Sequence, residues 1–132
     1  MHSDPGSGEV TVVTVDDQAI FLRTVRRLLA ATNGFVQVGE ATSGSRAIEL
    51  ASELRPDLVL VDVRMPEMDG IETARALHAL IPESVLVLIS VEEIPDAARL
   101  APGVVACLRK QDLSGRALSA LWAAHGATAT RR

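Results

Sequence analysis

Polar residues of three chemical kinds follow aliphatic runs at four places in the sequence. Asp16 and Asp17 end "VTVVTVDD", Asp62 ends "LVLVD", Ser90 ends "SVLVLIS" and Lys110 ends "VVACLRK". At an effective dielectric constant near 20, two carboxylates about 4 Å apart repel each other by roughly 4 kcal/mol. If the ends of these runs meet, the acids must share a proton, be separated by solvent or bind a cation.

An acidic, oxygen-only site with room for water suits Mg²⁺, which takes few protein ligands and a phosphate. A carboxylate can also attack phosphorus and become an aspartyl phosphate. That transfer requires mainly a metal and cations that neutralise the phosphoryl oxygens. We therefore expect Asp62 to be the nucleophile, Ser90 and Lys110 each to hold a phosphoryl oxygen, and Asp16 and Asp17 to hold the metal.

The segment "RMPEMDG" follows Asp62 directly. Arg64 lies two residues beyond the acid, so its main-chain carbonyl can turn back to the same ion, while we expect its side chain to be a solvated surface group. Pro66 fixes an extended turn, and Asp69 can cap a helix that opens at Gly70. This segment thus predicts how the chain leaves the acidic edge.

Strand and helix patterns alternate five times along the chain, without a hairpin turn between them. We expect strands at 10–17, 35–40, 58–62, 84–90 and 104–110, and helices at 18–31, 43–54, 71–80 and 112–126, with at most a short helix within 91–103. This alternation predicts a parallel sheet with right-handed crossovers. The carboxyl ends of such strands meet in one crevice, where ligands bind.

The composition supports one α/β domain. The chain has 132 residues, and 48% of them are apolar although only Phe21, Phe35 and Trp122 are aromatic. The core is therefore expected to be aliphatic, as in parallel sheets. We expect the domain to occupy residues 9–126, with a flexible arm at 1–8 and a tail or the start of a linker at 127–132, because Gly126 is expected to close the last helix.

The charge balance and the single cysteine exclude several classes of function. A net charge of −4 does not favour nucleic-acid contact by this chain itself. Cys107 has no partner for an internal disulfide, which fits a reducing cytoplasm. The longest aliphatic run, "VLVLI", is too short to span a membrane.

The sequence contains, in this order, "VDD", "LVLVDVRMPEMDGIE", Ser90 and "LRK". With these motifs, the chain resembles a response-regulator receiver domain from about Glu9 to Gly126. The intervals from Asp17 to Asp62 and on to Ser90 resemble the NarL-like branch, as does "KQDLSGRALSALWAAHG", which has no proline after its lysine. The resemblance implies a flavodoxin-like, doubly wound sheet of five parallel strands in the order 2-1-3-4-5, with about five helices.

The resemblance also implies a function. A histidine kinase would give its phosphoryl group to Asp62 in the presence of Mg²⁺, and an output domain or partner protein would read the change. The chain would then be the N-terminal part of a DNA-binding transcriptional regulator in the cytoplasm, away from any membrane. It would catalyse only its own phosphorylation and dephosphorylation, and a homodimer is compatible with this interpretation.

Two residues depart from the family pattern, one at the position of the rotating switch and one beside the acceptor aspartate. Receiver domains usually carry Tyr or Phe three residues before the lysine, and this sequence has Cys107, which we interpret as a small core residue. A small residue normally follows the hydroxyl residue of the fourth strand, and here Val91 is expected to narrow access to Asp62. The chemistry is retained, whereas the readout is altered.

The segment between the fourth and fifth strands is about two residues shorter than this branch leads us to expect. The fourth helix should therefore be short, and Pro95 cannot lie in its interior without removing a hydrogen bond. Glu92 and Glu93 fit acids at the start of that helix, where the helix dipole favours them.

Three other functions are compatible with parts of the pattern. A haloacid dehalogenase also uses an aspartate after a strand, but it needs a second acid where this sequence has Arg64. A flavodoxin-like nucleotide binder needs a glycine-rich first loop, and "VDDQA" is acidic. A pseudo-receiver, an interaction module that is never phosphorylated, fits the altered switch positions but not the retention of all five site residues.

Overall fold

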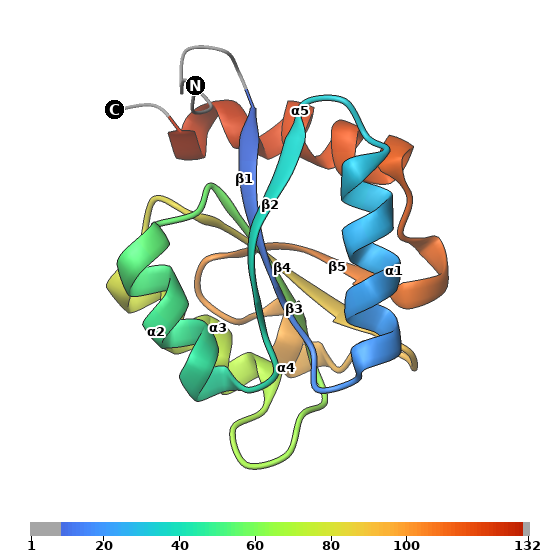
Figure 1. The fold of residues 1–132 in the computed structure, drawn as a ribbon. Helices are drawn as coiled ribbons and strands as arrows, with labels where there is room; N and C mark the ends of the chain where they lie inside the picture. Colours follow the sequence, from blue (N-terminus) through green and yellow to red (C-terminus); the bar gives the residue numbers. More distant parts are fainter. Residues whose placement is uncertain (1–8, 131–132) are drawn as a thin grey trace.

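The computed structural model describes residues 9–130 and contains one sheet of five parallel strands. The strands are β1 (Val10–Val15), β2 (Phe35–Ala41), β3 (Leu58–Asp62), β4 (Val85–Ser90) and β5 (Val104–Arg109). Their order across the sheet is β2-β1-β3-β4-β5, which confirms the predicted doubly wound, flavodoxin-like fold (Figure 1). The predicted arm at residues 1–8 lies outside the described residues.

Helices cover both faces of the sheet, so the domain has two cores. The helices are α1 (Ala19–Ala30), α2 (Gly44–Leu54), α3 (Gly70–Leu80), α4 (Asp96–Arg99) and α5 (Gly115–Thr130), and a 3₁₀ turn covers Lys110–Asp112. One aliphatic core lies under α2, α3 and α4, and the other lies under α1 and α5. Figure 1 shows α2 and α3 on one side of the sheet and α1 on the other. Among the described residues, none of the helices is both long enough and apolar enough to cross a membrane.

The register of the strands brings their carboxyl ends to the same level. Val15 of β1 pairs with Val61 of β3, so the next residues, Asp16 and Asp62, leave the sheet side by side. Ser90 is the last residue of β4, the neighbour of β3 on its other side. The sheet therefore gathers the polar strand ends as the sequence predicts.

After β3, the start of α3 packs closely against the backbone at the end of the strand. Asp69 is the N-cap of α3: its side chain accepts a hydrogen bond of 2.9 Å from the backbone N–H of Glu72, which reciprocates in a capping box. A Cβ added at Gly70 would collide with the carbonyl oxygen of Asp62 and lie 2.7 Å from the Cα of Val63. Glycine is therefore required here, because no side chain fits between helix and strand.

The segment after β4 contains the short helix that the sequence predicts. α4 has only four residues, and Pro95 is its N-cap rather than an interior residue. The interpretation of Glu92 and Glu93 as acids at the start of this helix is wrong, because the helix begins only at Asp96. Pro95 explains the late start, since proline is accepted at a helix N-terminus but not inside it.

The end of the last helix differs from the sequence-based expectation. α5 continues through Gly126 to Thr130, so the predicted helix stop at Gly126 is wrong. Gly126 is buried, and the ring of Trp122 packs directly against it at the place where a Cβ would stand. A glycine inside a helix costs only about 1 kcal/mol relative to alanine, a cost that such packing can offset.

Candidate functional site

The three acids of the sequence prediction meet at the carboxyl edge of β1 and β3. Asp16, Asp17 and Asp62 each offer a carboxylate oxygen, and these oxygens all lie within 4.8 Å of one another. Asp16 is fully buried and Asp62 is only 6% exposed, whereas Asp17 is exposed to solvent. The cluster therefore has one open side through which an ion or a phosphoryl donor can reach it.

Lys110 supplies the positive charge that this cluster needs. Its Nζ lies 2.7 Å from Oδ2 of Asp16 and 4.0 Å from Oδ1 of Asp62. The ammonium also lies over the ring of Phe21, 4.2 Å from its centroid, a contact that the sequence does not indicate. The other oxygen of Asp16 accepts a 2.7 Å hydrogen bond from the backbone N–H of Gln18, so the buried carboxylate is held from both sides.

Burial raises the pKa of the Asp62 carboxyl from its ordinary value of 3.8 to about 6. The charge of Asp16, and to a smaller extent that of Asp17, adds to this rise. The Lys110 ammonium and a hydrogen bond from the backbone N–H of Arg64 oppose it without cancelling it. The site thus disfavours the charged form of Asp62, and an added cation would favour it.

Ser90 ends β4 and is almost completely buried. Its Oγ accepts a 3.2 Å hydrogen bond from the backbone N–H of Glu92. The hydroxyl proton is therefore still available for an acceptor at the site, which a phosphoryl oxygen would provide.

Above Asp62 lies a hollow of about 260 Å³, which we call the acceptor hollow. Its lining residues are Gln18, Asp62, Arg64, Val91, Glu92 and Lys110. Val91 therefore stands at the approach to Asp62, in agreement with the sequence prediction. The hollow is large enough for a phosphoryl group with water around it.

Arg64 has more contacts than the sequence indicates. Its backbone N–H donates a hydrogen bond to the Asp62 carboxylate, whereas the predicted role of its carbonyl toward a metal stays a prediction. Its guanidinium, expected to be a plain surface group, pairs with Glu92 through an Nε–Oε1 distance of 3.1 Å. The pair connects the β3–α3 loop with the segment after β4. In the sequence, the signal for it is the opposite charge of two residues that each lie two positions beyond the end of a strand, Arg64 after β3 and Glu92 after β4.

The donor set fits Mg²⁺ better than a softer metal. The cluster offers only carboxylate oxygens, and among the described residues no histidine or cysteine belongs to it. Hard cations of this kind bind through one or two carboxylates and retain several waters. Asp16, Asp17 and Asp62 are therefore the residues that could hold the ion.

Cys107 occupies the β5 position at which the resemblance leads us to expect an aromatic ring. It is partly buried and packs against the core under α2, α3 and α4. Burial raises the pKa of its thiol, and the nearby charge of Arg99 opposes that rise. The thiol therefore behaves as a small core side chain rather than a reactive group.

Comparisons with known proteins agree with this geometry. The family model of the response regulator receiver domain matches residues 12–118. The response regulator GacA of Pseudomonas aeruginosa is 39% identical over 92 residues, which are 69% of this chain and 43% of that protein. A protein-glutamate methylesterase/protein-glutamine glutaminase of Alkalilimnicola ehrlichii is 40% identical over 82 residues, which are 62% of this chain and 21% of that protein.

Among solved structures, the receiver domain of the response regulator NarL from Mycobacterium tuberculosis superposes with a TM-score of 0.77. It is 32% identical, and the match covers 93% of this chain and 98% of that one. The chain spans less than half the length of these two curated relatives. The proteins that it resembles include a methylesterase and GacA as well as the NarL receiver domain, so the comparisons show the receiver domain family and do not single out its NarL-like branch.

Proposed function

Because the chain belongs to the response regulator receiver domain family, we propose that it is a phosphoacceptor switch in which Asp62 receives the phosphoryl group. The observation that carries this proposal is the placement of Asp62: its carboxylate lines the acceptor hollow, between two acids and the ammonium of Lys110. The donor would be the phosphohistidine of a histidine kinase.

In this reaction an Oδ atom of Asp62 forms the new bond to phosphorus while the bond from phosphorus to the histidine nitrogen breaks. The departing imidazole takes up a proton from solvent, so the electron pair of the broken bond ends as an N–H. With its pKa at about 6, Asp62 is mainly ionised at pH 7 and can attack without a separate base. Bound Mg²⁺ supplies charge neutralisation for the transferring oxygens.

The other site residues would stabilise the charge of the transferring phosphoryl group and of the metal. Lys110 can move from Asp16 toward a phosphoryl oxygen, because its Nζ already lies 4.0 Å from Asp62. Ser90 can donate its free hydroxyl proton to a second oxygen. Asp16 and Asp17 would hold the metal, together with the carbonyl of Arg64. The protein would catalyse only its own phosphorylation and dephosphorylation.

The output is proposed to be transcriptional. The likeness to GacA and to the NarL receiver domain supports a place at the N-terminus of a DNA-binding regulator in the cytoplasm, with the DNA contact made outside this chain. A homodimer is compatible with this role. A second candidate output is a methylesterase domain, which the Alkalilimnicola relative supports.

A second candidate function is an interaction module that is never phosphorylated. Cys107 favours it, because the residue has no ring to move, and so does Val91 at the approach to Asp62. The assembled acids and Lys110 argue against it, since an unused cluster of this kind would only destabilise the fold.

Beryllofluoride, a phosphoryl mimic that binds an aspartate carboxylate together with Mg²⁺, separates the two functions. We expect the amide NMR spectrum to change around Asp62, Ser90 and Lys110 in the parent protein but not in Asp62→Asn. An unchanged parent spectrum at saturating beryllofluoride and Mg²⁺ would favour the interaction module.

A further inference from the structure

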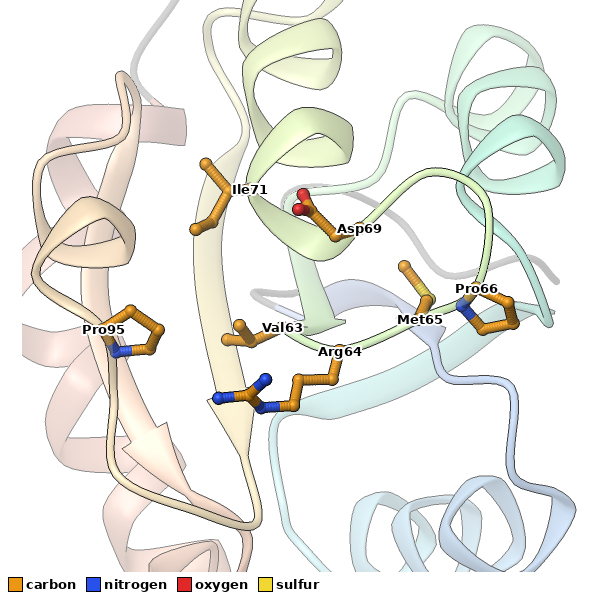
Figure 2. Close-up of a pocket in the computed structure, with 7 residues that line it drawn as sticks. All are labelled: Val63, Arg64, Met65, Pro66, Asp69, Ile71 and Pro95. Atoms are coloured by element: carbon orange, nitrogen blue, oxygen red, sulfur yellow. The ribbon is translucent and has the colours of Figure 1, made fainter.

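A second hollow of about 450 Å³ lies beside the acceptor hollow, and we call it the side hollow. Its lining residues are Val63, Arg64, Met65, Pro66, Asp69, Ile71 and Pro95 (Figure 2). They come from the β3–α3 loop, from the start of α3 and from the segment before α4. Because α4 begins only after Pro95, the segment that forms one wall is not helical.

Arg64 belongs to both hollows. Its side chain lines the acceptor hollow and the side hollow, and in Figure 2 it extends from the β3–α3 loop toward the segment that carries Pro95. The ion pair with Glu92 holds it there, although both side chains are largely exposed, at 64% and 68%. Exposed ion pairs contribute little to stability, so this one can exchange partners at little cost.

A phosphoryl group on Asp62 would change that pair. It would place close to two negative charges in the acceptor hollow, which both Arg64 and Glu92 line. The guanidinium is a good partner for phosphoryl oxygens, whereas the Glu92 carboxylate is repelled by them. Phosphorylation would therefore draw Arg64 away from the side hollow and leave the Glu92 carboxylate without this partner.

The side hollow has apolar walls and an acidic surround. Val63, Met65, Ile71 and the two prolines supply most of the wall. Exposed acids stand in the segments on both sides of it: Glu67 and Glu72 on one, and Glu92, Glu93 and Asp96 on the other. Among the described residues that line the side hollow, Arg64 is the basic one, and its charge opposes the attraction of the acids for a basic ligand.

We propose that the side hollow is a docking site for a partner segment in which an apolar side chain is flanked by lysine or arginine. The segment binds more tightly when Asp62 carries a phosphoryl group, because Arg64 no longer repels it and Glu92 joins the acids that attract it. The proposal rests on the proposed phosphorylation of Asp62. It gives the site a readout that requires neither an aromatic ring at position 107 nor a long fourth helix.

The test uses a peptide with a leucine between two pairs of lysines, titrated into the protein with Mg²⁺, with and without beryllofluoride. We expect amide shifts at residues 63–71 and 91–96, and an affinity at least about fivefold higher with beryllofluoride, the lower end of common coupling between sites. Matched peptides with serine in place of the leucine, or glutamates in place of the lysines, should bind more weakly.

Two variants test the assigned roles. Arg64→Gln removes the guanidinium and keeps the backbone, so peptide affinity without beryllofluoride should rise toward that of the activated parent. Glu93→Lys should weaken binding, whereas the control Glu53→Lys makes the same charge change at the exposed far end of α2 and should not.

Beryllofluoride binding is measured on the same samples, so that a failure of the proposed function can be told apart from a failure of the docking proposal. If beryllofluoride leaves the spectrum unchanged, the proposed function fails and the docking proposal fails with it. If beryllofluoride binds but the peptide does not, or binds equally in both states, or shifts other surfaces instead, the docking proposal alone is overturned.

Discussion

The two halves of the carboxyl edge of this sheet differ in how much of the family pattern they retain. At the ends of β1 and β3, three carboxylates converge within 4.8 Å, and Lys110 reaches them from the turn after β5 to pair with the most buried one. At the ends of β4 and β5, α4 is reduced to four residues and Cys107 stands where a ring is expected. The first half is chemically complete, and the second is structurally reduced.

This difference follows from what each half has to do. Phosphoryl transfer depends on a few charged atoms at fixed distances, and the strand register and the first residues after the strands set these. Transmission of the signal depends on a volume or a surface that differs between two states, and a ligand shifts an equilibrium only through such differences. The four-residue helix α4 and the small side chain of Cys107 provide few such differences between the two states. Phosphoryl transfer can therefore be retained although the usual readout is not.

The largest expected effect comes from breaking the buried pair in the complete half. Lys110→Ala leaves the fully buried Asp16 carboxylate without its ammonium, and we expect a loss of about 3–5 kcal/mol in the free energy of unfolding. Urea denaturation measures it. The double variant with Asp16→Asn should recover a large part of the loss, and a loss below about 1 kcal/mol in the single variant would contradict the pairing.

A somewhat smaller effect concerns the pH dependence of stability without metal. The folded pKa of Asp62 is raised from 3.8 to about 6, so between these values the folded state binds the proton more tightly than the unfolded state. The resulting stabilisation is full below about pH 4 and is lost as the pH rises through 6, a change of about 2–3 kcal/mol.

Asp62→Asn isolates this contribution from that of the other acids. The variant should lack this part of the pH dependence and should be more stable than the parent at pH 7 in metal-free buffer. Unfolding by urea at several pH values measures both quantities. Parallel pH profiles for the two proteins would show that the charge of Asp62 is not penalised.

Mg²⁺ should stabilise the parent protein by mass action, by about 1.4 kcal/mol at an ion concentration ten times the Kd. Asp17→Ala removes the exposed ligand, so it should abolish this stabilisation while relieving repulsion in the metal-free state. Thermal unfolding with and without Mg²⁺ gives both shifts. A parent melting temperature that ignores Mg²⁺ would rule out the metal site.

The smallest effect is expected in the reduced half. With beryllofluoride bound, amide exchange should change at the strand ends and in the first and fifth helices, with little new protection across residues 91–103. The movement of Arg64 and Glu92 proposed above needs only side-chain rotation in this region. Strong new protection across 91–103 would instead show that phosphorylation orders the segment around Pro95.

Most of the fold was predictable because its elements have periodic patterns. The β-branched runs predicted the strands, and the Asp69 cap before Gly70 predicted the start of α3. The close approach of Gly70 to β3 is visible only in the structure. The predicted stop at Gly126 was wrong because glycine is common just after helices, whereas here the ring of Trp122, one turn earlier in the same helix, packs against it.

The site was predictable to the extent that it depends on strand ends. The acids, Ser90 and Lys110 all follow aliphatic runs, and the parallel order brings these ends together. The Arg64–Glu92 pair and the ring of Phe21 under Lys110 were missed, because they depend on side-chain directions from separate loops and a helix. Opposite charges near two strand ends become a contact only once the loops are placed.

The central claim is that Asp62 accepts the phosphoryl group, and intact-mass measurement after incubation with acetyl phosphate and Mg²⁺ tests it most directly. We predict the addition of one phosphoryl group that is stable in acid and labile in base, its absence in Asp62→Asn, and its retention in the control Asp96→Asn, which changes an exposed acid at the start of α4. Labelling that persists in Asp62→Asn, or a parent protein that takes up no phosphoryl group, would contradict the claim.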